Sequence, residues 1–505
     1  MNEKKREAMA DGRAQIYMDH AATTELLPEV HEAMEPYLTE EYGNASTSYD
    51  LGKRNRKAIE DARSCIADEI DADSSEIYFT SGGSESDNWA IKNIAGAHKK
   101  KGQHIITSAI EHHAVLRSCE YLEELGYKIT YLDVDEYGLV DVKELTDSIR
   151  EDTILITIMT GNNEIGTLEP IGRIGQLARQ RGIVFHTDAV QAVGQIPLSM
   201  SRLPVDLLSA SAHKFHGPKG VGFLYVNKEQ ELPSFIHGGS QERGKRAGTE
   251  NVAGIVGMAK ALQIAACEMP YTRSRLIRLR NYFCERVLHE IPGSRLNGHP
   301  VKRLPGNLNF SFDGVDATSL LILMEEQGIC ASAGSACNTG QTRISHVIEA
   351  IHVPEEYAPG SVRFTMGRDT TKDLVDAVIL SLRQNVAALR GQRYLEQFRE
   401  KMPDCSSYSV FLVGAGNVVC SFFHIRCGIS HGNTDSGGID DGNVILGVAD
   451  CHGITGSNAQ CVSQLQKPCA LADIGPGEFQ IVVAATDTGY LRISLQKGAN
   501  LFPVL

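Results

Sequence analysis

The sequence predicts an α/β protein, with a mostly parallel central sheet covered by helices and a smaller α+β unit after it. From about residue 70 to 230, short apolar runs alternate with helical stretches, the order that builds a parallel sheet. After about residue 266 the pattern changes to long helices with few strands. The chain has 505 residues, 42 % hydrophobic and 22 % charged, which is ordinary for a globular protein of two or three domains.

Seven runs in the first region have the length and composition of buried strands. They cover residues 77–80, 104–108, 128–132, 154–159, 183–187, 207–209 and 222–226. Apolar residues recur at helical spacing between them, for example over residues 114–124 and 171–181. In a parallel sheet of this kind, ligands bind beyond the carboxyl ends of the strands. We therefore expect the functional site at that edge.

The rest of the chain divides into two further regions. Residues 266–395 contain predicted helices at 271–290 and 374–389, with strands at 307–312 and 362–366. The region 396–505 differs, because from Cys405 onward it holds only four Lys or Arg and seven Asp or Glu and is rich in Gly, Ser, Val and Cys. We expect a small β-rich appended domain there, with a poorly ordered tail as the alternative.

Composition and charge argue against several classes of partner. The net charge of −14 gives no reason to expect nucleic acid or an anionic membrane. No apolar run approaches the roughly 20 residues of a membrane helix, and the charged start lacks the apolar core of a secretory signal. The twelve cysteines are therefore expected to be free thiols in a reducing cytoplasm. The six after residue 400 form no Cys-x-x-Cys pair, so a metal or cluster site among them is imaginable but not favoured.

Lys214 stands in the loop sequence SAHKFHGPKG, between apolar runs that read as two buried strands. Most loop lysines are simply solvated, but a lysine can also be held there for covalent chemistry with a carbonyl group. Such a lysine usually serves pyridoxal phosphate (PLP). The protein must then also hold a phosphate, pair with the pyridine nitrogen and stack on the ring.

Candidates for these tasks follow other predicted strands. The sequence SGGS at 81–84 precedes a predicted helix whose first N–H groups could bind a phosphate. An ordinary turn with a helix N-cap would have the same sequence pattern. Asp188 suits the pyridine nitrogen, or else a helix N-cap. His112 can stack on the ring and move a proton, but a lone histidine is more often structural. The adjacent His113 has no separate argument.

Two residues of the later region add substrate chemistry. Arg363, in a predicted strand, can bind a carboxylate through two parallel hydrogen bonds, or it can form a surface ion pair. Cys337 lies among small residues in AGSACNTG, where a thiol reads as a nucleophile. Cys330, in a more apolar setting, is expected to be a packed thiol.

These residues lie in motifs that together resemble the cysteine desulfurases, PLP enzymes that supply sulfur for iron–sulfur cluster assembly and tRNA thiolation. The motifs are MDHAATT (18–24), FTSGGSESDN (79–88), EHHAV (111–115), NNEIGT (162–167), HTDAVQAVG (186–194), SAHKFHGPKG (211–220), RAGTEN (246–251), GSAC (334–337) and SVRFTMG (361–367). The resemblance covers about residues 16–395. It is specific because many separate motifs occur in order.

The resemblance implies an aspartate-aminotransferase-like fold (fold type I) that works as a homodimer. It implies a large PLP-binding domain over residues 24–265 and a small domain from residues 1–23 and 266–395. Residues 396–505 then remain an extension of unknown function. The implied substrate is L-cysteine, and the implied protein partner is a sulfur acceptor, either a cluster scaffold or a tRNA-thiolation enzyme.

The resemblance also implies roles for individual residues. Lys214 would bond covalently to PLP, Asp188 would pair with its nitrogen, and His112 would stack on its ring. Arg363 would bind the substrate carboxylate, and Cys337 would attack the substrate sulfur, which yields L-alanine and a persulfide on that cysteine. Further cofactor contacts are implied for Gly83, Ser84, Asn163, Gln191, Ser211, His213 and Thr249. Asn163 would also face the substrate, and Thr249 would reach the phosphate of the other subunit's cofactor.

One motif departs from the family, and three alternatives stay open. Residues 43–49 read GNASTSY, with Ala45 and Tyr49 where the family commonly has proline and histidine; no catalytic role falls there. A selenocysteine lyase is the nearest alternative. An inactive PLP-binding scaffold for cluster-assembly partners is another, although Lys214 and Cys337 together argue against it. An aminotransferase is the third, and it would not need Cys337.

Overall fold

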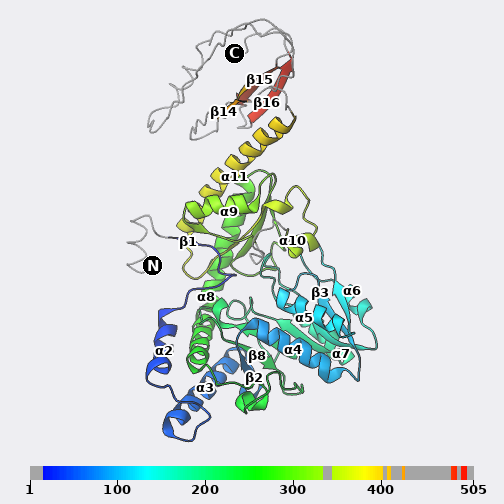
Figure 1. The fold of residues 1–505 in the computed structure, drawn as a ribbon, viewed down its shortest axis with the longest axis vertical. Helices are drawn as coiled ribbons and strands as arrows, with labels where there is room; N and C mark the ends of the chain where they lie inside the picture. The colour runs from blue at the N-terminus through cyan, green and yellow to red at the C-terminus, as the bar shows by residue number, and fades with distance from the viewer. Residues whose placement is uncertain are drawn as a thin grey trace, which may run out of the picture. The chain divides into compact units, whose positions relative to one another are not determined.

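The computed structural model describes residues 15–333 and 344–401 and, beyond them, four strands at 407–410, 423–426, 479–485 and 491–497 (Figure 1). The chain forms two compact units, Met1–Arg390 and Gly391–Leu505. In the described part of the second unit, β13 (Ser407–Val410) pairs antiparallel with β14 (Phe423–Arg426), and β15 (Phe479–Ala485) with β16 (Leu491–Lys497). The six cysteines after residue 400 lie outside the described residues.

A seven-stranded sheet dominates the first unit. Its strands, in chain order, are β2 (Ile77–Thr80), β3 (His104–Ser108), β4 (Lys128–Leu132), β5 (Thr153–Thr157), β6 (Val184–Asp188), β7 (Leu207–Ser211) and β8 (Gly222–Val226). Their spatial order is β2-β8-β7-β6-β5-β3-β4. Six of these strands run in the same direction, and only β8 runs opposite to them. The prediction of a mostly parallel sheet is therefore confirmed.

Helices cover both faces of this sheet. They are α3 (Asp50–Glu69), α4 (Gly83–His98), α5 (His113–Glu124), α6 (Val142–Ser148), α7 (Ile171–Arg181) and the first half of α8 (Val252–Glu290). Successive strand residues point to opposite cores, as the two-residue period requires. Leu207 and Leu224 pack on one side with Trp89 of α4, while Leu208 and Phe223 pack on the other. Burial on both faces explains why the strands read as continuous apolar runs.

A second, three-stranded antiparallel sheet follows, with the order β12-β10-β9. Its strands are β9 (Ser294–Leu296), β10 (Asn307–Phe312) and β12 (Ser361–Thr365). Its core gathers Phe283, Phe310 and Phe364 against α9 (Ala317–Glu326) and α11 (Lys372–Lys401). Beside it, the short β1 (Ile16–Tyr17) pairs in parallel with β11 (Ile329–Cys330). The N-terminal segment then continues next to β12, where Asp19 forms a bridge with Thr365.

Helix α8 links the two sheets. Met258 in its first half belongs to the core of the large sheet, and Phe283 in its second half belongs to the core of the small sheet. It lies beside α2 (Pro28–Thr39) and α3 (Figure 1). By length and composition alone, α8 is the one helix among the described residues that could cross a membrane. Its place in two packed cores is that of an internal helix of a globular protein. The predicted domain boundary at residues 265/266 falls inside it.

Candidate active site

One cavity of about 390 Å³ lies at the carboxyl ends of the parallel strands. Ten of the twelve predicted site residues line it: Gly83, Ser84, His112, Asn163, Asp188, Gln191, Ser211, His213, Lys214 and Arg363. Nine of them come from the large sheet and its loops, and Arg363 reaches in from the small sheet. The structure does not place Thr249 in this cavity, and Cys337 lies outside the described residues.

Lys214 stands at the end of β7, in the short 3₁₀ helix Ala212–Lys214. Its Nζ donates hydrogen bonds to the carbonyl oxygens of Ala21 (2.6 Å) and Ala22 (2.9 Å), on the N-terminal segment. The pKa of Lys214 is lowered to about 8, mainly by burial and then by the charge of Arg363, while Asp188 acts in the opposite direction. A fraction of this amine is therefore unprotonated near neutral pH.

Asp188 is the last residue of β6 and is buried. Its Oδ1 accepts a hydrogen bond from the Val190 backbone N–H at 2.9 Å. Burial raises the pKa of Asp188, and His112 and Lys214 partly offset that rise. The carboxylate thus faces the cavity with two basic side chains near it, which is a setting for a protonated ring nitrogen.

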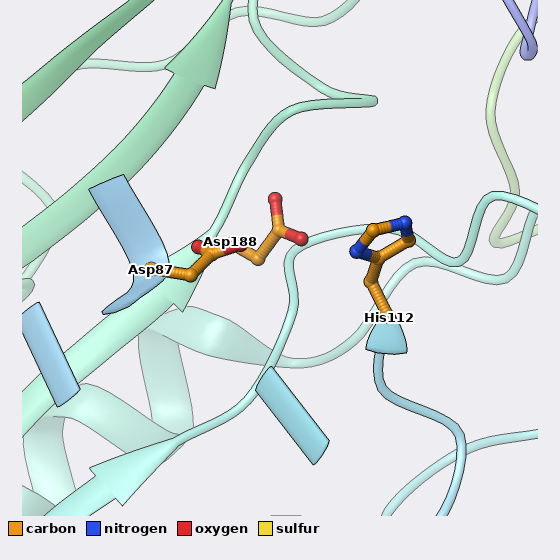
Figure 2. Close-up of side chains that lie close together, drawn as sticks. All are labelled: Asp87, His112 and Asp188. Atoms are coloured by element: carbon orange, nitrogen blue, oxygen red, sulfur yellow. The ribbon is translucent and has the colours of Figure 1, made fainter. Parts of the chain in front are cut away.

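His112 caps the N-terminus of α5, and its ring is open to the cavity. Its Nδ1 accepts from the Ala114 N–H at 3.2 Å, so the proton of a neutral ring lies on Nε2. Burial lowers the pKa of His112, which favours that neutral form. Atoms of His112, Asp188 and Asp87 lie within 4.8 Å of one another, with the Asp188 carboxylate between the other two side chains (Figure 2).

The turn before α4 forms the phosphate candidate. Gly82 has φ 145°, a conformation that L side chains rarely adopt. At Gly83 an added Cβ would lie 2.5 Å from the Val190 side chain, so glycine lets the helix begin this close to the turn after β6. The first N–H groups of α4 and the Ser84 and Ser211 side chains share the cavity wall. This is the arrangement that binds phosphate at a helix N-terminus.

Two further predicted residues fix the N-terminal segment. Gln191 Nε2 donates to the Ala21 carbonyl at 2.9 Å, and His213 Nδ1 lies 3.1 Å from the Thr23 hydroxyl. Burial lowers the pKa of His213 to about 4, so its ring is neutral. Gln191 and His213 therefore contact the same N-terminal segment whose carbonyl oxygens accept hydrogen bonds from Lys214.

Arg363 is buried, 3 % exposed, and is not the surface ion pair that the sequence left open. Its Nη2 donates to Asp19 Oδ1 at 2.6 Å, and its Nη1 donates to the Asn163 carbonyl at 3.2 Å. Its Nε has no hydrogen-bond partner in the described structure. A buried guanidinium with an unused donor is prepared for an additional anionic oxygen.

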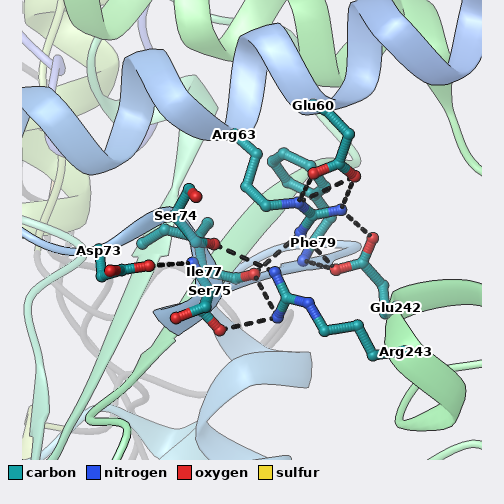
Figure 3. Close-up of polar contacts among 9 residues, drawn as sticks. All are labelled: Glu60, Arg63, Asp73, Ser74, Ser75, Ile77, Phe79, Glu242 and Arg243. Atoms are coloured by element: carbon teal, nitrogen blue, oxygen red, sulfur yellow. Dashed lines mark hydrogen bonds and ion pairs between the residues drawn. The ribbon is translucent and has the colours of Figure 1, made fainter.

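The segment before Thr249 is fastened to the edge of the large sheet through Glu242 and Arg243 (Figure 3). Glu242 binds the buried Arg63 guanidinium through two oxygens (2.8 and 2.9 Å) and accepts from the Phe79 N–H at 2.9 Å. Both Glu242 (φ 46°) and Arg243 (φ 58°) have a left-handed backbone conformation, which is strained for residues other than glycine. The contacts of Glu242 must compensate for the cost of this strain.

The next residues continue this attachment. Arg243 donates to the carbonyl oxygens of Ser74 (3.1 Å) and Ser75 (2.8 Å) at the start of β2 (Figure 3). Arg246 pairs with Glu85 of α4 at 2.9 Å. The segment that ends in Thr249 is therefore fixed beside the phosphate candidate, although Thr249 does not line this chain's own cavity.

Several cavity residues were missed by the sequence reasoning. They are Asp19, Asp87, Glu111, Glu164, His113 and His346. The spacing of Asp87, four residues after Gly83 on one helix face, was a signal for that residue. His113 was given no role, yet its ring centroid lies 4.8 Å from that of His346 at the cavity wall.

The predicted cysteine nucleophile, Cys337, lies outside the described residues. The segment 334–343, which carries Cys337, is outside the described residues, but Ser332 before it and His346 after it both line the cavity. Cys330 lies in β11, half-buried, and burial raises the pKa of its thiol. A thiol in that state is a poor nucleophile.

Comparison with known proteins agrees with this geometry. The family model of the class-V aminotransferases matches residues 16–378. The chain is 51 % identical over 376 residues to cysteine desulfurase IscS of Methanosarcina thermophila, covering 74 % of this chain and 93 % of that protein. It is 52 % identical over 378 residues to cysteine desulfurase IscS of Dictyoglomus turgidum, covering 75 % and 96 %.

Solved structures give the same result. A NifS-like protein superposes with a TM-score of 0.70 at 36 % identity, covering 74 % of this chain and 99 % of that one. A NifS-like protein from Rickettsia africae superposes with a TM-score of 0.66 at 30 % identity over the same shares. The predicted aminotransferase-like fold is confirmed. The chain belongs to the class-V aminotransferase family and, within it, to the cysteine desulfurases.

Proposed function

We propose that this protein is a PLP-dependent desulfurase that converts L-cysteine to L-alanine and carries the released sulfur as a persulfide on Cys337. The observation that supports it most directly is the single cavity that collects Lys214, Asp188, His112 and Arg363.

The residues present fit PLP. The N-terminus of α4 would offer its first N–H groups to the phosphate. Gly83 lets these groups lie close to Val190, because a Cβ there would be 2.5 Å from the Val190 side chain. Asp188 would pair with the ring nitrogen, His112 would stack on the ring, and Lys214 would hold the aldehyde carbon. Ser84, Ser211 and His213 would complete the phosphate contacts, with Gln191 and Asn163 beside the ring. When bound, PLP supplies an electron sink for the carbon atoms of the substrate.

Lys214 is suited to accept and return a proton at Nζ. Because its pKa is about 8, the amine exchanges protons readily at neutral pH. The carbonyl oxygens of Ala21 and Ala22 orient Nζ without neutralising it. Asp188 remains nearby as a fixed negative charge, which keeps the protonated form accessible.

Arg363 would bind the substrate carboxylate. Its unused Nε and the adjacent Nη2 form an edge that can donate two parallel hydrogen bonds. Asp19 would then share or release Nη2. The contact from Nη1 to the Asn163 carbonyl keeps the guanidinium plane fixed while that exchange takes place.

Cys337 would accept the sulfur. Its thiolate attacks the substrate sulfur, a new S–S bond forms, and the carbon–sulfur bond breaks with its electron pair left on the substrate carbon. Protonation of that carbon gives alanine, so cysteine and one protein thiol become alanine and one persulfide. The placement of Ser332 and His346 at the cavity wall supports access of the intervening segment to the substrate.

We further propose a cytoplasmic homodimer in which Thr249 contacts the phosphate in the other subunit. The segment fixed through Glu242 and Arg243 supports this, because it holds Thr249 firmly and outside its own cavity. The sulfur acceptor would be a cluster scaffold or a tRNA-thiolation enzyme. The domain division at 24–265, with residues 1–23 and 266–395 as the small domain and 396–505 as an extension, stays a prediction.

The test is an absorbance spectrum together with alanine and sulfide release from L-cysteine. We expect a yellow protein whose Cys337→Ala variant keeps the PLP band and loses desulfuration, while Cys330→Ala retains both. A colourless protein would contradict the proposal. A yellow Cys337→Ala variant that releases sulfur at the wild-type rate would point instead to direct elimination, as in a selenocysteine lyase.

A further inference from the structure

A second carboxyl group lies next to Asp188. Asp87, on the first turns of α4, is 1 % exposed, and its Oδ1 has no hydrogen-bond partner among the described residues. Atoms of Asp87, Asp188 and His112 lie within 4.8 Å of one another, and Figure 2 shows Asp188 between the other two. Asp87 therefore adjoins Asp188 and lines the same cavity.

The groups around Asp87 do not provide a positive charge for it. From β6 it faces Asp188 and His186, from β7 it faces Ser209, and from the segment after β3 it faces Glu111. His186 Nε2 is 3.7 Å from Asp87 Oδ1 but lies 3.0 Å from the Ser209 hydroxyl. Burial lowers the pKa of His186 to about 3, so this ring is neutral and not a counter-ion.

Two carboxylates this close and this buried disfavour joint ionisation. The two carboxylates lie within 4.8 Å of each other. At an effective dielectric constant of about 20, a negative charge at that distance lowers the ionisation constant of the second carboxyl group by a factor of roughly 10²–10³. Asp188 has compensation, because the Val190 N–H and the charge of Lys214 favour its ionised form. Asp87 has only the Ser209 hydroxyl, and burial with the charge of Asp188 raises the pKa of Asp87 well above 3.8.

We infer that Asp87 holds a proton and Asp188 holds the negative charge, so that the pair presents one charge to the cavity and Asp87 is a positioning residue for Asp188. The inference about the pair rests on this geometry. Its value for catalysis rests on the proposed function, in which Asp188 faces the ring nitrogen. A neutral Asp87 keeps Asp188 ionised without adding a second charge beside it.

The opposing arrangement is a buried ion pair between ionised Asp87 and protonated His186. The two arrangements give opposite results for Asp87→Asn, which keeps the shape of the side chain but cannot ionise. A carboxyl with a raised folded-state pKa binds more protons folded than unfolded, so wild-type stability falls as pH rises above about 4. The asparagine variant lacks this loss. An ion pair would instead leave the variant with an unpaired buried imidazolium.

The experiment measures thermal unfolding of the full-length holoenzyme from pH 5 to pH 8. We expect the folding equilibrium constant of Asp87→Asn, relative to wild type, to rise by up to about tenfold per pH unit. Asp133→Asn, an exposed aspartate after β4, is the matched control and should show no such trend. A variant that is less stable than wild type at every pH, with no gain toward pH 8, would overturn the inference.

A second readout observes the proton directly. At pH 7 the infrared spectrum of wild type should contain a carbonyl band of a protonated carboxyl that Asp87→Asn loses and Asp133→Asn keeps. An unchanged band in Asp87→Asn would contradict the inference. The PLP absorbance band should persist in Asp87→Asn, and its loss from a stably folded variant would show that the charge of Asp87 is required. If wild type itself lacks the PLP band, the proposed function fails while the unfolding and infrared results still decide the state of the pair.

Discussion

Lys214 is predicted to be an unusually reactive amine. Its pKa is lowered from 10.5 to about 8, first by burial and then by Arg363, while Asp188 and Asp19 act in the other direction. At pH 7 an amine with a pKa of 8 is about 9 % unprotonated, against roughly 0.03 % for a pKa of 10.5. The structure thus gives Lys214 about 300-fold more of the nucleophilic form than an exposed lysine has.

The assay follows the absorbance change as PLP attaches covalently to protein from which it was removed. The rate should rise about tenfold per pH unit below pH 8 and level off above it. Arg363→Gln removes the second cause of the lowered pKa, so its inflection should lie at higher pH. Lys219→Ala, an exposed lysine of the same loop, is the control and should match wild type. A wild-type rate that climbs tenfold per unit up to pH 10 would refute the reasoning.

Two further predictions concern the scaffold. Glu242→Gln should lower the free energy of unfolding by about 3–5 kcal/mol, because it leaves a buried guanidinium without its main partner. Glu60→Gln, whose side chain is 58 % exposed, should lower it by no more than about 1 kcal/mol in the same urea titration. Gly166→Ala should lower it by about 1–3 kcal/mol, since φ is 76° and the new Cβ would lie 2.6 Å from Asn307 Oδ1. Gly182→Ala (φ 62°, with open space around it) isolates the backbone part of that effect, and an equal loss in both variants would count against the steric argument.

Much of the site could be predicted because parallel strands deliver their carboxyl ends to one edge. Asp188 ends a strand, and His112 and Lys214 each follow one, so local patterns were sufficient to bring them together. Strand limits were less certain. Residues 158 and 159 were expected in a strand that ends at Thr157, and Asp188 was expected after a strand that in fact includes it. Both differences concern the last residues before a loop. After Thr157 the apolar pattern continues although the strand has ended, whereas at Asp188 the pairing with Ser209 continues although the apolar pattern has stopped.

Other features depend on contacts that the sequence does not encode locally. Asp19 meets Arg363 across 344 positions, and no spacing rule connects them. In the sequence, Asp87 is an ordinary polar residue at a helix start, and its burial next to Asp188 appears only when α4 packs on β6 and β7. Glu242 and Arg243 read as a charged loop, yet they are bonded to α3 and to the start of β2.

The most direct test of the central claim is the mass of the Cys337 peptide after incubation with L-cysteine in the absence of a reductant. The proposed function predicts one additional sulfur atom on that peptide and one alanine released per chain. Formation of pyruvate and ammonia, or alanine release with no sulfur on Cys337, would contradict it.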